Sequence, residues 1–229
     1  MIFSCRRLAA VLMGLILAAM PLQAQSFFKN IDWTVRGSVL FFPENNGPAS
    51  APMPILPSLG GGASYPLSKL LALEVSLDLY ATTYDYDFTL DRAVPANDEF
   101  RAAFVVGSIL AFQPVFRFYP GEGKFTIRAF GGLALDLRII FRAYNLADSE
   151  VYEGHTLLEY RKAIGSYFWG KGRFIFPFLG YGMDFPITDG LDLGFDLRAW
   201  FPLWRIWSGE KLPGIDSFRF GIGFRLGFK

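Results

Sequence analysis

The feature of this sequence that most constrains its fold is a strict alternation of large apolar residues with polar or small ones. The last twelve residues read FRFGIGFRLGFK, with an aromatic or aliphatic residue at every second position and only glycine or arginine between them until the terminal lysine. Side chains of a β-strand point alternately to its two faces, so this spacing predicts a strand with one apolar face. The sequence shows no comparable apolar stripe at helical spacing.

The same alternation predicts seven further strands. Four segments carry it clearly, namely 31–42, 71–80, 125–142 and 191–201. Three weaker segments fill the gaps between them, at 58–65, 102–118 and 174–185. With the terminal strand, the sequence therefore predicts about eight strands and an all-β fold.

The connections between these strands alternate in length. Tight turns rich in Pro, Gly and Asp occur at 66–69, 120–124 and 186–190. Long segments separate them, at 43–57, 81–101, 143–166 and 202–216. All long connections then emerge at one end of an up-and-down sheet, which predicts a closed antiparallel β-barrel with unequal ends.

Composition limits the class of protein. The chain is 52% hydrophobic, yet after its first two dozen residues it has no apolar run of the roughly 18 residues that a membrane-spanning helix needs. A formal charge of +1 argues against a nucleic-acid partner, and a single histidine leaves little material for a metal site. The only cysteine is Cys5, and no cofactor is expected.

The first residues have the pattern of a secretory signal peptide. Arg6 and Arg7 form a basic start, Leu8 to Met20 an apolar core, and Ala24 a small residue at the expected cleavage position. Residues 1–24 are therefore predicted to be removed, Cys5 included. Residues 25–229 form the predicted barrel domain.

Three features favour lipid, rather than a protein core, as the surroundings of the apolar faces. The polar faces carry small residues among their charges, as a narrow interior requires, and they use arginine with acidic residues but almost no lysine. Aromatic residues also gather near the predicted strand ends, as in interfacial girdles. These aromatic residues are Trp33, Phe41, Phe42, Tyr65, Tyr80, Phe118, Phe185, Trp200, Phe201 and Trp204.

The terminal strand is expected to close the barrel by pairing with the first, because an open edge in lipid leaves backbone groups unsatisfied at several kcal/mol each. Its alternating residues resemble the carboxy-terminal β-signal that the outer-membrane insertion machinery recognises, offset by one because Lys229 follows Phe228. The residues that carry this resemblance are Phe220, Ile222, Phe224, Leu226 and Phe228.

Over 27–228 the chain resembles the small eight-stranded bacterial outer-membrane barrels, such as outer membrane protein W and the barrel of outer membrane protein A. The phrases GGGASYPLSKLLALEVSLDLY, YPGEGKFTIRAFGGLALDL and FLGYGMDFPITDGLDLGFDLRAW carry the resemblance. It implies a location in the bacterial outer membrane and contact with outer-membrane lipid. It also implies delivery to the membrane by the insertion machinery.

Charged residues on the polar faces are the candidate functional site. They are Arg36, Glu74, Asp78, Arg117, Arg128, Asp136, Arg138, Arg142, Asp192, Asp196, Arg198, Arg219 and Arg225, with Asp32 and Asp184 on the same faces. One interpretation is a network of ion pairs that fills a narrow lumen. The other is a pathway whose charges tune the passage of small solutes.

His155 lies in the third long segment, with Ser149, Glu153, Glu159 and Ser166 nearby. A catalytic triad needs nucleophile, base and acid on rigid elements, whereas this segment is expected to be a polar loop. We therefore expect no enzymatic activity.

Two other long segments carry distinct patterns. The first is rich in proline and suits a shielding surface loop or contact with an extracellular ligand. In the second, residues 84–88 alternate aromatic and acidic types, a pattern compatible with a hairpin that extends beyond the membrane.

Two functions remain open from the sequence. In the first, the chain is an integral outer-membrane protein that forms a narrow channel for small or hydrophobic solutes, as in the outer membrane protein W family. Alternatively, it is a surface-exposed structural protein or adhesin that acts through its extracellular loops and has a plugged lumen.

Overall fold

The computed structural model describes residues 30–43, 55–96, 103–120, 125–142, 147–210 and 214–228. Residues 32–229 form one compact unit. The predicted signal peptide, 1–24, lies outside the described residues, as do most residues of the first long loop.

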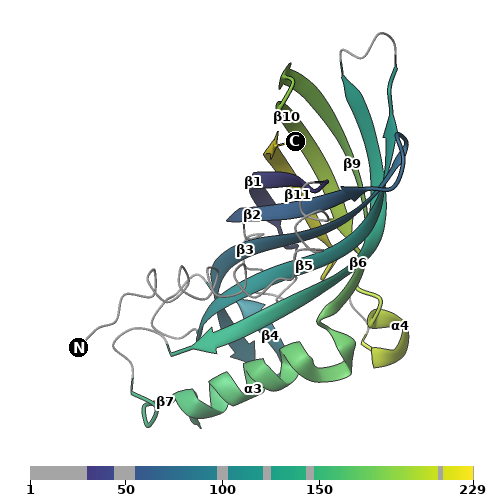
Figure 1. The fold of residues 1–229 in the computed structure, drawn as a ribbon. Coiled ribbons are helices and arrows are strands. Elements are labelled where there is room, and N and C mark those ends of the chain that lie inside the picture. The colour runs from purple at the N-terminus through teal and green to yellow at the C-terminus, as the bar shows by residue number, and fades with distance from the viewer. Residues whose placement is uncertain are drawn as a thin grey trace, which may run out of the picture. The chain divides into compact units, whose positions relative to one another are not determined.

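Eight long strands form a closed antiparallel barrel, as the sequence predicts (Figure 1). Each strand pairs with its neighbours along the chain, and the last pairs with the first. The strands are β1 (Asp32–Phe41), β2 (Ile55–Pro66), β3 (Leu71–Asp87), β5 (Ala103–Phe118), β6 (Thr126–Phe141), β9 (Ile175–Thr188), β10 (Leu191–Trp200) and β11 (Arg219–Phe228).

Strand β11 closes the barrel. Its register with β1 runs without a shift from Trp33 opposite Phe228 to Phe41 opposite Phe220. The side chains of Ile222 and Phe224 point outward and are 40% and 65% exposed, whereas the alternate positions are buried. Closure thus gives both edge strands their backbone partners, which a structure surrounded by lipid requires.

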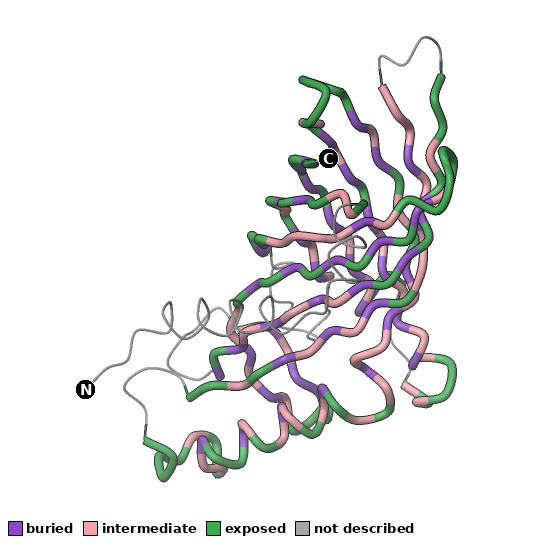
Figure 2. Tube along the Cα trace, viewed as in Figure 1, coloured by how far each residue is buried: buried purple, intermediate pink, exposed green. Residues whose placement is uncertain are grey.

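The barrel carries its apolar side chains on the outside. Exposed and buried residues alternate along the strands (Figure 2), and the exposed positions are predominantly Leu, Val, Ile and Phe. On β3, for example, Leu73, Val75, Leu77 and Leu79 are all exposed, while Glu74 is buried. A contiguous apolar exterior around a charged interior is stable only in lipid. The prediction that the apolar faces contact lipid is therefore confirmed.

The end of the barrel with the long connections carries additional structure. Strand β3 continues past the barrel wall and forms a hairpin with β4 (Arg92–Pro95), which confirms the predicted extension. The third long connection contains β7 (Val151–Tyr152), β8 (His155–Thr156), α3 (Leu157–Trp169) and η1 (Gly170–Gly172), and the fourth contains α4 (Arg205–Ser208). Among the described residues, no helix is long and apolar enough to cross a bilayer.

Helix α3 contradicts the prediction that the sequence lacks a helical stripe. Its buried residues are Leu157, Tyr160, Ile164 and Phe168, which recur at helical spacing. Thr156 caps the helix, and its hydroxyl accepts from the backbone N–H of Glu159 while Glu159 reaches back to the N–H of Thr156. The helix packs against β3, β4 and β6.

Candidate functional site

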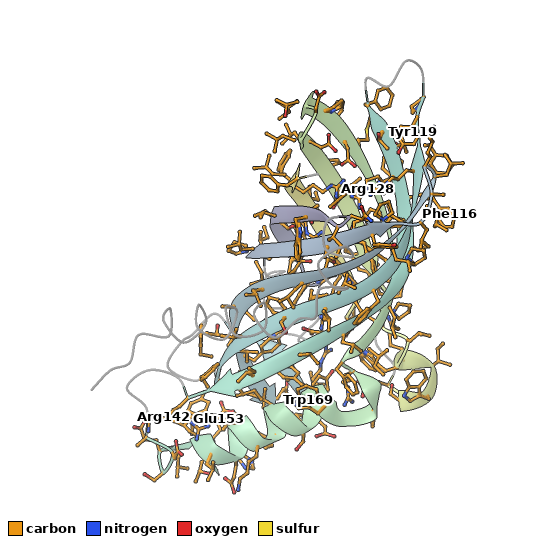
Figure 3. The ribbon with its side chains drawn as sticks, in the orientation of Figure 1. Phe116, Tyr119, Arg128, Arg142, Glu153 and Trp169 are labelled. Carbon is orange, nitrogen blue, oxygen red and sulfur yellow. The ribbon has the colours of Figure 1, made fainter. Side chains whose placement is uncertain are left out.

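The structure brings most of the predicted interior charges together inside the barrel. In Figure 3, Arg128 points into the interior, whereas Phe116 lies on the outer surface. Arg117 and Asp192 are half-buried, and Arg142, just past the end of β6, is exposed and does not join the interior. The buried members of the predicted set are Arg36, Glu74, Asp78, Arg128, Asp136, Arg138, Asp196, Arg198, Arg219 and Arg225.

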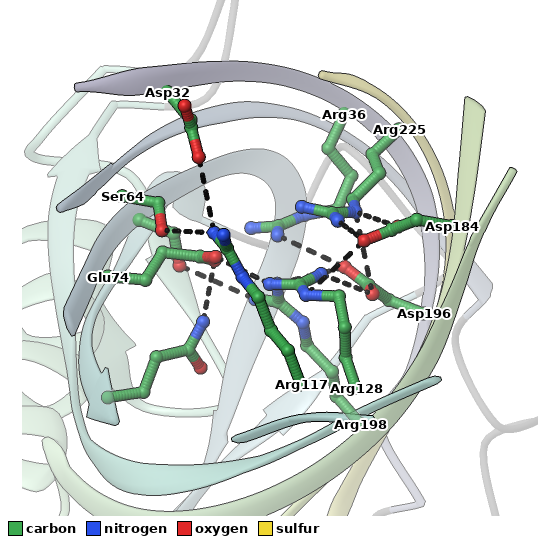
Figure 4. Close-up of polar contacts among 12 residues, drawn as sticks. Asp32, Arg36, Ser64, Glu74, Arg117, Arg128, Asp184, Asp196, Arg198 and Arg225 are labelled. Carbon is green, nitrogen blue, oxygen red and sulfur yellow. Dashed lines mark hydrogen bonds and ion pairs between the residues drawn. The ribbon is translucent and has the colours of Figure 1, made fainter. Parts of the chain in front are cut away.

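The centre of the barrel holds one interlocked group of ion pairs (Figure 4). Arg36 donates two hydrogen bonds to Asp78, from Nε to Oδ1 at 2.9 Å and from Nη2 to Oδ2 at 2.5 Å. Arg198 lies between Asp78 and Asp196, with Nη–Oδ distances of 3.4 and 3.3 Å. Such two-point contacts match the planar guanidinium to carboxylate geometry. Asp78 and Arg198 therefore each have two charged partners.

Arg128 connects this group to the next carboxylates. Its Nη2 donates to Oε2 of Glu74 at 2.5 Å and its Nη1 donates to Oδ1 of Asp196 at 3.1 Å. Its Nε lies 3.7 Å from Oδ2 of Asp184, which in turn pairs with Arg225. Arg128 is only 1% exposed. A guanidinium in this position is stable only because three carboxylates surround it.

A second charged group lies nearer the long-loop end. The carboxylate of Asp136 accepts from Arg138 Nε and Arg219 Nη1, both at 2.5 Å, and from the Tyr80 hydroxyl at 2.8 Å. Both guanidinium groups also lie over aromatic rings: Arg138 is 4.1 Å from the ring centre of Phe168 in α3, and Arg219 is 4.0 Å from that of Phe176. Among the described residues, Asp136 accepts from two guanidinium groups, and the rings give each cation a further favourable contact.

Aromatic side chains fill the space around the charged groups. Phe42, Tyr80, Trp200 and Trp204 were predicted as interfacial girdle residues, but all four are buried, so this prediction is wrong for them. Phe42, Tyr80 and Trp200 belong to the interior apolar cluster. Other members of this cluster are Phe130, Phe176 and Phe178. Trp33, Phe118 and Phe185 are exposed, as a girdle requires.

Glycines on the polar faces make room for these rings. Tyr80 pairs across the sheet with Gly107, and Phe130 pairs with Gly180. A Cβ atom at either glycine would collide with the opposite ring. The alternation in the sequence places small residues on the polar faces but does not identify the rings opposite them, because that pairing depends on strand register.

Apolar packing covers part of the long-loop end. A second core joins α3 to the extended wall, through Ile164 and Phe168 of the helix and Tyr84, Ala103 and Val105 of β3 and β5. The rings of Tyr84 and Phe168 meet edge to face at 4.8 Å. This core lies directly above Arg138, which contacts both rings.

The short-turn end has a small polar cavity of about 80 Å³. Asp32, Arg117 and Asp192 line it together with the pair Asp184–Arg225. Arg117 donates to Asp32 at 3.3 Å and to Ser64 at 3.1 Å. The cavity ends where the central ion pairs begin, because Asp184 and Arg225 belong to both.

His155 and its neighbours do not form a triad-like arrangement. The imidazole stacks on Phe88 with ring centres 3.7 Å apart, and its Nδ1 lies 4.0 Å from Glu159. Ser149 lies in a turn before β7, and Ser166 lies in α3 more than two turns beyond the cap. Glu159 is occupied with the helix cap.

The fold and its surface define the class of the protein: an integral β-barrel of the outer-membrane type, with eight strands, an apolar belt and a charged interior. No protein-family model matches the chain, and no curated protein matches it either. The fold is similar to that of several solved structures.

Three of these structures are small barrels. Neisserial surface protein A shares 11% identity with a TM-score of 0.49, covering 87% of this chain and 97% of that one. OprG of Pseudomonas aeruginosa shares 12% with a TM-score of 0.47, covering 86% and 95%. The N-terminal barrel domain of OprF of the same organism shares 12% with a TM-score of 0.43, covering 86% and 96%. At this level of identity the likeness concerns the fold alone.

Proposed function

We propose that this protein is a closed, non-conducting outer-membrane barrel that acts through its extracellular end, as a surface-exposed structural protein or adhesin. The observation that carries the proposal is the filled interior. Arg36, Arg128 and Asp196 are at most 2% exposed, and each is paired with more than one partner.

A conducting pore needs a continuous path for water and solute, lined by groups that the path leaves exposed. Here the charged groups of the barrel centre face one another, and a layer of rings that includes Phe130, Phe178 and Trp200 lies beside them. Above this layer, Phe168 of α3 packs on Arg138. Across the described residues, the charged groups, the layer of rings and the contact of Phe168 with Arg138 thus occupy successive levels of the lumen. This filling disfavours the channel hypothesis.

The long-loop end, which faces outside the cell in barrels of this class and is called here the extracellular end, also supports the proposal. The β3–β4 hairpin and α3 share a buried core, so this part of the end presents a fixed surface. Binding sites often lie on such connections when a rigid scaffold positions them.

The first test is single-channel conductance of the mature chain, refolded into a planar bilayer. Heat-modifiable gel migration verifies that the barrel has formed, and a porin in the same membrane is the positive control. We expect a folded but silent barrel. Reproducible openings would refute the proposal and favour the channel.

A second test separates adhesion from a purely structural role. Residues 88–90 at the tip of the β3–β4 hairpin are replaced by glycine and serine, and cells displaying each chain are compared for attachment to cultured epithelial cells. Lost attachment with an intact barrel supports adhesion. Unchanged attachment supports the structural role.

A further inference from the structure

A small apolar and cationic surface lies at one corner of the long-loop end. We call it the rim patch and define it as Trp169, Lys171, Ile206 and Trp207. Ile206 is 78% exposed and Trp207 is 57% exposed, so Ile206 is more exposed than Leu59 (66%) and Phe224 (65%) on the lipid-facing wall. Large apolar side chains held in water at this level call for a partner surface.

The rim patch is held in a fixed conformation. The indole N–H of Trp207 donates to the backbone carbonyl of Lys171 at 2.7 Å, and the same ring lies against Gly172. Lys171 has a φ of 52° and Gly172 a φ of 76°, so two successive residues adopt the left-handed region. A lysine rarely adopts this conformation unless its surroundings hold it there. The contact with Trp207 therefore fixes both the indole and the lysine backbone.

The patch is continuous with the lipid-facing wall. Lys171 precedes β9 by four residues and α4 follows β10 by five, and these strands remain joined at the rim, where Phe201 N–H donates to the Pro177 carbonyl at 2.9 Å. The outward residues below, such as Leu179 on β9 and Leu197 on β10, are exposed. Figure 1 shows α4 at the same end of the barrel as the C-terminus of α3. This places the patch just outside the hydrocarbon region, where headgroups begin.

Charge distinguishes this corner from the opposite end of α3. At the rim patch, the exposed cation among the described residues is Lys171, whose ammonium is half exposed and lies 3.6 Å from Glu210. Arg173 is buried and pairs with Glu210, and Arg205 is half-buried and donates to the backbone carbonyls of Gly214 and Asp216. At the other end of α3, the exposed acidic residues are Asp148, Glu150, Glu153 and Glu159. An exposed lysine ammonium combined with indole rings suits an anionic interface.

We propose that the rim patch docks on the outer leaflet and recognises anionic lipid headgroups. Trp169, Ile206 and Trp207 enter the interfacial zone, and the Lys171 ammonium faces the headgroup phosphate. Indole rings suit this zone because they combine apolar area with one N–H donor, and lysine extends its charge toward the polar layer.

The first experiment locates the patch relative to the bilayer. The mature chain is predicted to lack cysteine, so Ile206→Cys provides a unique site for an environment-sensitive dye in phosphatidylcholine vesicles. Val151→Cys, at the acidic end and 67% exposed, is the matched control. We expect brominated lipid to quench the dye at 206 and aqueous iodide to quench the dye at 151. If iodide quenches both dyes equally, the proposal is wrong.

The second experiment tests headgroup recognition. The dye at 206 is quenched by brominated phosphatidylglycerol or by brominated phosphatidylcholine at the same mole fraction. We expect up to about fivefold preference for the anionic lipid, the factor that one lysine near an anionic surface contributes. Lys171→Asn, which tolerates the left-handed backbone, should reduce the ratio to about one, whereas Lys162→Asn on α3 should not. Equal quenching by both lipids in the wild-type background would overturn the proposed recognition.

Discussion

The barrel interior and its extracellular end are stabilised by different kinds of contact, ion pairs in the first and apolar packing in the second. In the interior, arginines and carboxylates form a network surrounded by aromatic rings, and each charge is stable because its neighbours are in place. At the extracellular end, α3 covers the wall with Ile164, Phe168 and other apolar residues, and few charges take part. The first region therefore depends on all of its members, whereas we expect the second to respond to substitutions as a local unit.

This difference predicts how each region fails. Removing one member of a buried charge network leaves its partners unpaired in a low-dielectric site, which costs more than the lost contact itself. Removing an apolar side chain from a local core leaves a cavity whose effect stays near the removed group.

The largest effect is expected for Arg128→Ala. It leaves Glu74 and Asp196 without their closest cation, and we expect the free energy of unfolding to fall by about 3–5 kcal/mol. Urea titration of the chain in liposomes measures the change. Arg142→Ala is the matched control, because Arg142 lies outside the network, and it should shift stability by less than about 0.5 kcal/mol. Equal shifts for both variants would contradict the network interpretation.

The extracellular core provides the contrasting test. Phe168→Ala removes a ring that contacts both Tyr84 and Arg138, at a local cost of about 3 kcal/mol. We expect faster hydrogen exchange across α3 with heat-modifiable migration of the barrel unchanged. Leu158→Ala, on the exposed side of the helix, should leave exchange near the wild-type rate. Loss of the folded barrel in the Phe168 variant would mean that the two regions are not separable.

The fold could be predicted from sequence because lipid imposes a simple rule. A strand with lipid on one side must alternate, so positions such as Leu73, Glu74 and Val75 give both the strand and its orientation. Closure follows from the same environment, since an open edge is too costly there. The candidate interior charges came from the same alternation, and Arg142 departs from them because the strand ends one residue before it.

The extracellular end could not be predicted in the same way. Outside lipid, no environment forces a strand to alternate. The sequence signals for α3 are also weaker: they are one capping box at Thr156 and Glu159, followed by apolar residues at helical spacing that Gly165 interrupts. Long aromatic side chains such as Tyr160 and Phe168 suit strands as well as helices when read alone. Which arginine pairs with which carboxylate also depends on strand register and barrel shear, which alternation does not specify.

A glycine substitution tests register inside the barrel. Gly107→Ala places a methyl group where the Tyr80 ring lies, so the ring must move away from Asp136. We expect a loss of about 1–3 kcal/mol in the free energy of unfolding, typical of overpacking. Gly37→Ala is the control, since its added Cβ has no atom within 4 Å. Similar stability for both variants would mean that Tyr80 has free space.

The smallest effect is expected at the cap of α3 and depends on pH. Hydrogen bonds from the Thr156 backbone N–H and hydroxyl hold the pKa of the Glu159 carboxyl below its usual value. A carboxyl with a lowered pKa in the folded state contributes stability at pH values above its ordinary pKa, and this contribution is lost as the pH falls through the lowered value. The start of α3 should therefore loosen in acid while the barrel remains closed.

Backbone chemical shifts of residues 157–160, followed between neutral and acidic pH in detergent micelles, measure this loosening. The Glu159→Gln variant keeps an oxygen that can accept from Thr156 but has no charge to titrate, so its shifts should not change over the same range. Titration of these shifts in the Gln variant as in the wild type would show that another group controls the cap. Loosening of the cap should leave the barrel unaffected, because the contact of the helix with the interior charges that the structure describes is made by Phe168, at the opposite end from the cap.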